Sequence, residues 1–395
     1  MASANPPISK TKILNVLVIG ANGYLGHAIS RAFLRGGGST QLDNVHFRVF
    51  GLIRRSSAAP FLAKDEIIPI VASIPNTEPI LAESSTWDVI VTAIEPAFTD
   101  PPATKEQHWA NLLILIQRLA EVSSAKGVRP LVLWSSGCKD YGTTGLHGDE
   151  ALTPHTEDSP LDALPLIKQR TDAALRALEV ARAAGSSFDV SVVRATPVFG
   201  YSGSYFGAGL AYAAAAAAAA AATASTDNDK GKVFKFTADA GTILHAVHVD
   251  DCAEGYVSLA TSALFRHRRS AVAGEVFNIS GRKYETLEEV GGALAAEYGF
   301  DGGCQFRVAA EELAEGLSVV TSQLVFGWSQ WVASDKIRKV TGWSDSRPLF
   351  SEDMRVYRLA YEAAAVATGD SGRASSASTV GSEDVGRIKE RLAGI

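Results

Sequence analysis

Short apolar runs alternate with segments of helical periodicity through the first half of the chain. Segments rich in apolar residues cover residues 13–19, 47–53, 67–71, 87–93, 129–134 and 188–194. Apolar positions recur at helical spacing over residues 25–34, 108–126 and 166–184. Apolar runs of this length are typical of strands buried on both faces of a parallel sheet. The pattern predicts an α/β fold in which helices cover both faces of a doubly wound parallel sheet.

The second half of the chain predicts a smaller lobe that also returns strands to the sheet. Short apolar runs at 246–249 and 275–279 fall inside a region, about 233–281, from which we expect these added strands. We therefore predict a main domain over residues 12–200 and a smaller C-terminal lobe, mainly over residues 201–365.

Three segments depart from this alternation. Residues 1–11 are polar and turn-rich, and residues 366–395 are rich in Ser, Gly and Thr, so we expect flexible ends with a short terminal helix near 384–392. Ala213 to Ala222 is an unbroken alanine run. Alanine favours helix, and the run is too short and too weakly hydrophobic to span a bilayer, so we expect a surface helix and no membrane contact.

Three glycines join the first apolar run to the first helical segment. Gly20, Gly23 and Gly26 follow the run 13–19 and precede the helix pattern 25–34. In such a turn the first glycine permits the tight bend, the second lets the backbone approach a pyrophosphate, and the third lets the helix pack close to the strand. The helix N-terminus attracts the phosphate charge. The motif predicts a dinucleotide site; the alternative is a glycine turn with a structural role alone.

Composition indicates which partners and which location to expect for this protein. The 395 residues carry a formal net charge of −6, which argues against a nucleic-acid-binding surface. Cys138, Cys252 and Cys304 have neither metal-ligand spacing nor the pattern of a disulfide framework. We expect no metal site and a cytoplasmic location.

Further motifs give a family resemblance. The loop is G-x-x-G-x-x-G, and it is followed by Ser135-Ser-Gly-Cys-Lys-Asp-Tyr-Gly142, Val193-Arg-Ala-Thr-Pro-Val-Phe-Gly200 and Gly274-Glu-Val-Phe-Asn-Ile-Ser-Gly281. Together these segments resemble the extended or atypical branch of the short-chain dehydrogenase/reductase superfamily, the epimerase/dehydratase-like proteins. The resemblance implies a Rossmann-type dinucleotide domain, a small-molecule substrate in the smaller lobe and, as one expected assembly, a homodimer.

The end of the second strand indicates which cofactor the site takes. NAD sites usually place an acidic residue there to bind the ribose 2′-hydroxyl. Here Arg54, Arg55 and Ser56 stand at this point, and guanidinium groups suit a 2′-phosphate. We therefore expect NADP(H), with NAD(H) second; the alternative is that the arginines face solvent or stack on adenine. By resemblance, the cofactor-binding residues are Gly20, Asn22, Gly23, Tyr24, Leu25, Gly26, Arg54, Arg55, Ser56, Ala93, Ile94, Lys168 and Pro197.

The catalytic residues of the superfamily are not in their usual places. The resemblance implies a Tyr four residues before a Lys, but none of the ten tyrosines has that partner. Lys168 falls at the expected Lys position, and Leu164 stands where the Tyr would be. Gly137 stands at the usual Ser/Thr position, with Ser136 just before it. Arg170 matches the P-L-x-x-x-R string of atypical members.

Three functions remain open at this stage. A relocated acid, namely Tyr141, Tyr201, Tyr205 or Lys139, could serve a reductase of a small carbonyl or enone compound, with Lys168, Arg170 and Ser136 as its other candidate catalytic residues. A non-redox isomerase, dehydratase or cyclase could use the nucleotide as a scaffold. A non-catalytic regulator could sense NADP. The first is our leading expectation, so we predict an NADP-dependent oxidoreductase with an atypical active site.

Overall fold

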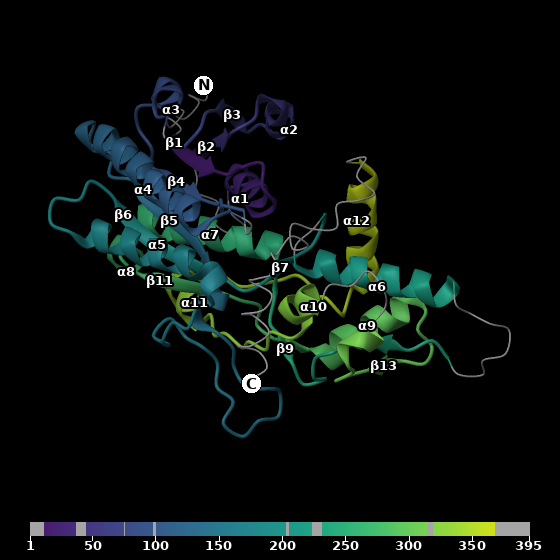
Figure 1. The fold of residues 1–395 in the computed structure, drawn as a ribbon. Coiled ribbons are helices and arrows are strands. Elements are labelled where there is room, and N and C mark those ends of the chain that lie inside the picture. The colour runs from purple at the N-terminus through teal and green to yellow at the C-terminus, as the bar shows by residue number, and fades with distance from the viewer. Residues whose placement is uncertain are drawn as a thin grey trace, which may run out of the picture.

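A seven-stranded parallel sheet forms the centre of the structure, a computed structural model that describes residues 12–36, 45–74, 76–97, 100–202, 205–222, 231–313 and 319–367. The strand order is β11-β6-β5-β4-β1-β2-β3, and every neighbouring pair is parallel. The predicted doubly wound sheet is confirmed (Figure 1). Its strands are β1 (Lys12–Ile19), β2 (Val45–Ile53), β3 (Ile68–Val71), β4 (Val89–Thr92), β5 (Leu131–Gly137), β6 (Asp189–Ala195) and β11 (Val276–Ile279).

Two apolar clusters bury the two faces of this sheet. One cluster joins the sheet to α1 and α7, and the other joins it to α4 and α5. Burial on both faces explains why the central strands are continuous apolar runs. The helical elements around the sheet are α1 (Tyr24–Leu34), η1 (Ser56–Ala58), α2 (Ala59–Ala63), α3 (Glu78–Glu83), α4 (Pro102–Ala125), η2 (Cys138–Tyr141), α5 (Pro165–Arg182), α7 (Val249–Phe265), α8 (Arg269–Val272) and α11 (Asp335–Thr341).

The smaller lobe has a core of its own, rich in aromatic side chains. Phe234, Phe236 and Phe326 are buried there against one another. The lobe is built from β7 (Val198–Phe199), α6 (Tyr205–Ala222), β8 (Phe234–Lys235), β9 (Ile243–Leu244), β10 (Val247–His248), β12 (Glu285–Thr286), α9 (Leu287–Tyr298), β13 (Cys304–Gln305), η3 (Ala310–Glu312), α10 (Val319–Phe326) and α12 (Met354–Ala367). Figure 1 shows the lobe to one side of the sheet, with α12 projecting from it.

Helix α6 contains the alanine run and differs from its prediction. It begins at Tyr205, eight residues before the run, because Gly207, Leu210 and Tyr212 pack into the lobe core. Among the described residues it is the one helix long and apolar enough to cross a membrane by length and composition. Its buried first half makes it a core helix, whereas the alanine-rich second half is more exposed. The predicted flexible ends at 1–11 and 368–395 lie outside the described residues; residues 366 and 367 complete α12.

Two helices begin at a proline, earlier than the apolar pattern predicted. The helix expected from residue 108 begins at Pro102. Residues 102–107 are polar and carry no apolar periodicity, so the pattern did not show them as helical. Proline at the first helical position is already in the helical φ range and lacks only an N–H that would have no partner in the helix. The helix α5 likewise begins with proline, at Pro165.

Candidate functional site

The glycine loop turns tightly between β1 and α1, against the end of β4. Gly20 has a φ of +89°, and a Cβ atom there would lie 2.2 Å from Ile94 Cγ2 and 2.5 Å from the Ala93 carbonyl oxygen. A Cβ atom on Gly26 would lie 2.2 Å from the Gly20 carbonyl oxygen. Both positions therefore exclude any side chain, as the sequence predicted for close packing of strand, turn and helix.

The surroundings of the loop fit the pyrophosphate of a dinucleotide. Helix α1 begins at Tyr24 with Gly23 as its N-cap, and its first turn contains no acidic residue. The amides of that turn are available to an anion, which the positive end of the helix also attracts. The loop lies between β1 and β4, where the strand order reverses direction, and such a switch point is where ligands bind in open α/β sheets.

Arg54, Arg55 and Ser56 follow β2 and are exposed. Neither guanidinium has a hydrogen-bond or ion-pair partner within the described part of the chain, and the charge of Arg54 acts on His108 of α4. Two unpaired guanidiniums at the end of β2 can receive a phosphate group.

A second link crosses from the glycine loop to the smaller lobe. The Tyr24 hydroxyl donates a hydrogen bond of 2.6 Å to the Gly200 carbonyl oxygen, after β7. Gly200 has a φ of +112°, and a Cβ atom there would lie 2.3 Å from His248 Nε2. The next residue, Tyr201, also has a positive φ, of 51°. Gly200 and Tyr201 are thus held in a fixed bend beside the glycine loop.

The ends of β4, β5, α5 and β6 meet in a buried ionic network. Asp140 of η2 is fully buried and accepts a 2.8 Å hydrogen bond from Arg170 Nη2. Its other oxygen accepts from Arg194 Nε at 3.3 Å and from the Ser136 hydroxyl at 2.5 Å. Arg170 Nη1 also reaches Glu95 Oε1, at 3.3 Å. Arg170 and Ser136, both predicted as site residues, are therefore brought together through Asp140.

Arg170 lies where a side chain on residue 137 would extend. A Cβ atom on Gly137 would lie 3.0 Å from Arg170 Nη2 and 3.3 Å from Arg170 Cζ. A serine or threonine at position 137 would press on the guanidinium group. The glycine and the arginine are therefore structurally complementary.

Tyr205 and Lys139 meet in a small cavity next to this network. The Lys139 Nζ atom lies 4.2 Å from the ring centre of Trp328 and 5.1 Å from that of Tyr205. Tyr205 packs on the apolar cluster that contains Leu164. Thus Leu164, which stands in place of the family's tyrosine, belongs to the apolar cluster against which Tyr205 of α6 packs. The cavity, of about 20 Å³, is lined by Lys139, Pro197, Tyr205, Phe206, Ile243, Leu244, His245, Leu324, Val325, Trp328 and Gln330.

Burial and nearby charges shift the pKa values of Lys139, Tyr205 and Arg170. Burial and the nearby charge of Arg170 hold the pKa of Lys139 well below its ordinary value. Burial raises the pKa of Tyr205 to about 12, although Arg170 acts to lower it. Burial also acts to lower the pKa of Arg170, but Glu95 and Asp140 outweigh it and the pKa stands above its usual range. Lys139 is therefore the more acidic of the two candidate proton donors.

The structure places the other predicted catalytic residues elsewhere. Lys168 is exposed, and its ammonium lies 2.7 Å and 2.8 Å from the two oxygens of Asp172. Tyr201 is 47% exposed and donates to Asp250. Tyr141 is buried; its hydroxyl donates to Asn278 Oδ1 and accepts from Arg194. None of the three lines the Lys139 cavity.

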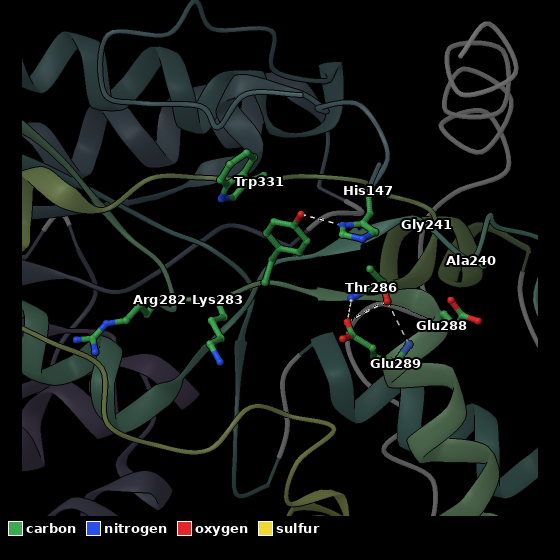
Figure 2. Close-up of a pocket in the computed structure, with 10 residues that line it drawn as sticks. His147, Ala240, Gly241, Arg282, Lys283, Thr286, Glu288, Glu289 and Trp331 are labelled. Atoms are coloured by element: carbon green, nitrogen blue, oxygen red, sulfur yellow. Dashed lines mark hydrogen bonds between the residues drawn. The ribbon is translucent and has the colours of Figure 1, made fainter. Parts of the chain in front are cut away.

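A second, larger pocket lies on the outer side of the cavity wall. It has a volume of about 470 Å³ and is open to solvent. In Figure 2, Arg282 and Lys283 lie toward one side of it and Glu288 and Glu289 toward the other. Its lining includes Trp331, which follows Gln330 of the inner cavity. No residue predicted as catalytic or cofactor-binding lines this pocket.

Comparison with known families agrees with this geometry. A sequence profile of the NAD dependent epimerase/dehydratase family matches residues 16–280. The chain belongs to this family. The resemblance drawn from the motifs is confirmed, and this family member is a nucleotide-cofactor-binding protein of the extended short-chain dehydrogenase/reductase type. Comparison with the curated proteins finds no match.

Solved structures share the fold at low sequence identity. The dTDP-glucose 4,6-dehydratase of Bacillus anthracis, in complex with NAD, aligns with a TM-score of 0.59 at 15% identity over 89% of this chain and 98% of its own. The UDP-glucose 4-epimerase of Bifidobacterium longum, with NAD+ and UDP, gives 0.58 at 16% over 88% and 98%. The UDP-glucuronic acid 4-epimerase of Bacillus cereus, with UDP-glucuronic acid and NAD, gives 0.60 at 16% over 89% and 99%.

Sequence reasoning missed several residues that build the site in this family member. Glu95 and Asp140 complete the network around Arg170, and Trp328 and Gln330 close the cavity. Asp140 could have been proposed from the sequence, because it lies between Lys139 and Tyr141 inside the motif at residues 135–142. Residues 328 and 330 come from a distant segment that carries no local signal for a site.

Proposed function

We propose that this family member is an NADP(H)-dependent reductase of a small carbonyl or enone compound, with Lys139 as its proton donor. The observation that carries the proposal is the position of the Lys139 ammonium, in an apolar cavity beside Tyr205 and without a carboxylate partner among the described residues. When bound, a reduced nicotinamide would supply the hydride.

The residues at the end of β2 support NADP(H) as the cofactor. Arg54 and Arg55 are exposed, have no acceptor among the described residues, and stand where a 2′-phosphate would reach. The glycine loop would bind the pyrophosphate of the same cofactor. The structures named above contain NAD, so the choice of NADP rests on this chain's own arginines.

Lys139 can protonate a carbonyl oxygen as that oxygen becomes an alkoxide. Because burial holds the pKa of Lys139 well below its ordinary value, its ammonium is a stronger acid than an exposed lysine and can transfer a proton to this oxygen more readily. Tyr205 lies next to it and can donate a hydrogen bond to the same oxygen. Arg170, fixed by Glu95 and Asp140, keeps positive charge near that oxygen.

The cavity is lined mostly by apolar residues, and its volume of about 20 Å³ fits the reacting carbonyl group of a largely apolar substrate rather than the whole molecule. Seven of the eleven lining residues, including Phe206, Leu324 and Trp328, are aliphatic or aromatic residues or proline without an ionisable group. Diphosphate recognition would require several cations, and Lys139 is the one cationic side chain among these lining residues.

Loss of NADPH absorbance with a panel of small ketones, aldehydes and enones tests the proposal. We expect substrate-dependent NADPH oxidation and tighter binding of NADPH than of NADH. Product formation without NADPH consumption would instead identify a non-redox isomerase, dehydratase or cyclase.

One observation favours a second candidate, a regulator that binds NADP without turnover. The guanidinium of Arg170 extends over Gly137, and its ion pairs with Glu95 and Asp140 join the ends of β4, η2 and α5. Such a network suits a fixed structural role as well as catalysis. NADPH binding with no turnover across the panel, together with a conformational change on binding, would support the regulator and contradict the reductase.

A further inference from the structure

We propose that the open pocket beside Tyr284 and Trp331 binds a small aromatic zwitterion, a molecule whose ammonium and carboxylate groups lie at opposite ends of an aromatic body. Lys283 binds the carboxylate and Glu288 binds the ammonium. This inference goes beyond the proposed function, because the pocket shares no lining residue with the Lys139 cavity.

The pocket has the size and the accessibility that a small ligand requires. Its volume of about 470 Å³ falls within the range of small-molecule sites, roughly 300–1,000 Å³. The pocket is open to solvent, and Lys283 and Glu288 are both exposed, so a ligand can reach their charged groups directly. Tyr284 and Trp331 are half-buried and provide an aromatic wall.

This aromatic wall is held in place by neighbouring segments. The Tyr284 hydroxyl lies 2.9 Å from His147 Nδ1, and the His147 amide donates to the Gly241 carbonyl oxygen at 2.8 Å. The rings of Tyr284 and Trp331 meet edge to face, with their centres 5.5 Å apart. The Trp331 amide donates to the Thr144 hydroxyl at 3.0 Å. Because the rings are fixed before a ligand arrives, the wall favours a rigid aromatic body over a flexible chain.

Four charged side chains line the pocket, and the protein already uses two of them. The Arg282 guanidinium donates a hydrogen bond to the Ser344 hydroxyl. The Glu289 carboxylate accepts from the Thr286 amide at 2.7 Å and from the Thr286 hydroxyl at 2.9 Å, which forms a capping box at the start of α9. These two groups are therefore committed to the structure of the pocket wall.

Lys283 and Glu288 are the charged groups that remain for a ligand. Within the part of the chain that the structure describes, neither side chain has a hydrogen-bond or ion-pair partner, and they do not pair with each other. They lie toward opposite sides of the pocket (Figure 2). A singly charged ligand would leave one of them without a partner, and a diphosphate would be repelled by Glu288 and Glu289. The pocket therefore favours a ligand with one charge of each sign, separated by its aromatic body.

Two sets of matched ligands, titrated calorimetrically into the full chain, test this assignment. In the first set, 4-(aminomethyl)benzoate carries both charges, benzylamine lacks the carboxylate and 4-methylbenzoate lacks the ammonium. The second set, with a longer amine arm, is 4-(2-aminoethyl)benzoate, 2-phenylethylamine and 4-ethylbenzoate. We expect at least one zwitterion to bind about fivefold more tightly than either singly charged member of its set, as a partly exposed ion pair allows. Equal affinities within both sets, or no binding of either zwitterion, would overturn the inference.

Two variants identify the residue that binds each charge. Lys283→Met should abolish the preference for the zwitterion over the amine and keep the preference over the carboxylate, and Glu288→Gln should do the reverse. Unchanged preferences in these variants would contradict the assignment. Lys126→Met and Glu106→Gln, at exposed positions in and after α4, are the matched controls and should bind as wild type does. Circular dichroism checks folding; if a variant unfolds, the ligand sets on the wild-type chain still decide.

The aromatic body is tested separately. The compound trans-4-(aminomethyl)cyclohexanecarboxylate has both charges on a saturated ring and should bind less tightly than 4-(aminomethyl)benzoate, because it offers no π face to Tyr284 and Trp331. Equal affinity would contradict the aromatic part of the proposal. None of these titrations requires NADPH or turnover, so their outcome is independent of the proposed reductase activity.

Discussion

The two parts of the candidate site, the glycine loop after β1 and the side chains at the end of β5, are built in different ways. Around β1 the site consists of backbone: Gly20, Gly23 and Gly26 leave room where side chains would clash, and helix α1 presents its free amides. Around β5 the site consists of side chains from η2, α5, α6 and the segment before α11, which meet at Lys139 and Arg170. The first end carries the glycine motif of its family, and the second lacks the Tyr and Lys spacing that the family resemblance implies. The candidate cofactor end thus depends on local backbone geometry, whereas the candidate catalytic end depends on side chains that tertiary contacts bring together.

The largest expected effect is at the end made of side chains. Lys139→Met removes the proposed proton donor but keeps the apolar stem that packs on Trp328 and Tyr205. Turnover should fall by about 10²–10⁴-fold, the usual contribution of a general acid, with NADPH affinity nearly unchanged. Steady-state kinetics and calorimetry measure the two effects. Lys126→Met, at an exposed lysine after α4, is the matched control; a Lys139→Met enzyme with full turnover would remove Lys139 from the mechanism.

The next effect tests the backbone-made end. Gly26→Ala would place a Cβ atom 2.2 Å from the Gly20 carbonyl oxygen, so the loop or α1 must shift. We expect a loss of about 1–3 kcal/mol in the free energy of unfolding, typical of overpacking, and weaker NADPH binding. Urea unfolding and calorimetry check both. Gly292→Ala in α9, where a Cβ atom would meet nothing within 4 Å, is the control and should be neutral or slightly stabilising.

A smaller effect concerns cofactor choice. Arg54→Ala removes one guanidinium proposed to bind the 2′-phosphate, so NADPH affinity should fall by about tenfold while NADH affinity stays the same, because a charged hydrogen bond contributes about 1.5–3 kcal/mol. Direct titration with both cofactors measures this. Arg48→Ala, at an exposed position earlier in β2, is the control. An equal loss of affinity for NADPH and NADH would show that Arg54 does not bind the 2′-phosphate.

The smallest effect is on stability, and it depends on pH. Because the pKa of Lys139 is lower in the folded chain than in the unfolded one, the unfolded chain binds more protons between those two values, and stability rises with pH across this range. Below the folded pKa, Lys139→Met should therefore be more stable than wild type. The gap should shrink as the pH rises toward about 10. Thermal unfolding at several pH values measures it; a constant gap would contradict the assignment.

Sequence patterns predicted the backbone-made end almost completely. The sheet, its strand positions and the glycine loop follow from buried apolar runs and from the conformational freedom of Gly20, which are local properties of the chain. Helix α4 began earlier than predicted because Pro102 starts a polar first turn that has no periodicity.

The arrangement of side chains around Lys139 and Arg170 could be predicted from the sequence only in part. Arg170, Ser136, Tyr205 and Lys139 were all candidates, but the sequence could not separate them from Tyr141, Tyr201 and Lys168. Tertiary contacts separate them: Lys168 pairs with Asp172 in solvent, and Tyr141 binds Asn278. Gln330 had no signal, since its place in the cavity wall depends on the carbonyls of Cys138 and Gly142, nearly two hundred residues away.

The contact between Gly137 and Arg170 has a consequence for sorting related sequences. A Cβ atom at position 137 would lie 3.0 Å from Arg170 Nη2, so the guanidinium would have to shift by a few tenths of an ångström, and a shorter residue at 170 would leave Asp140 without one of its two arginine partners. We therefore expect the glycine and the arginine to occur together. Among relatives of this chain, a glycine at the first position should be accompanied by an arginine at the second, and this pair of residues would mark the subgroup that shares this contact.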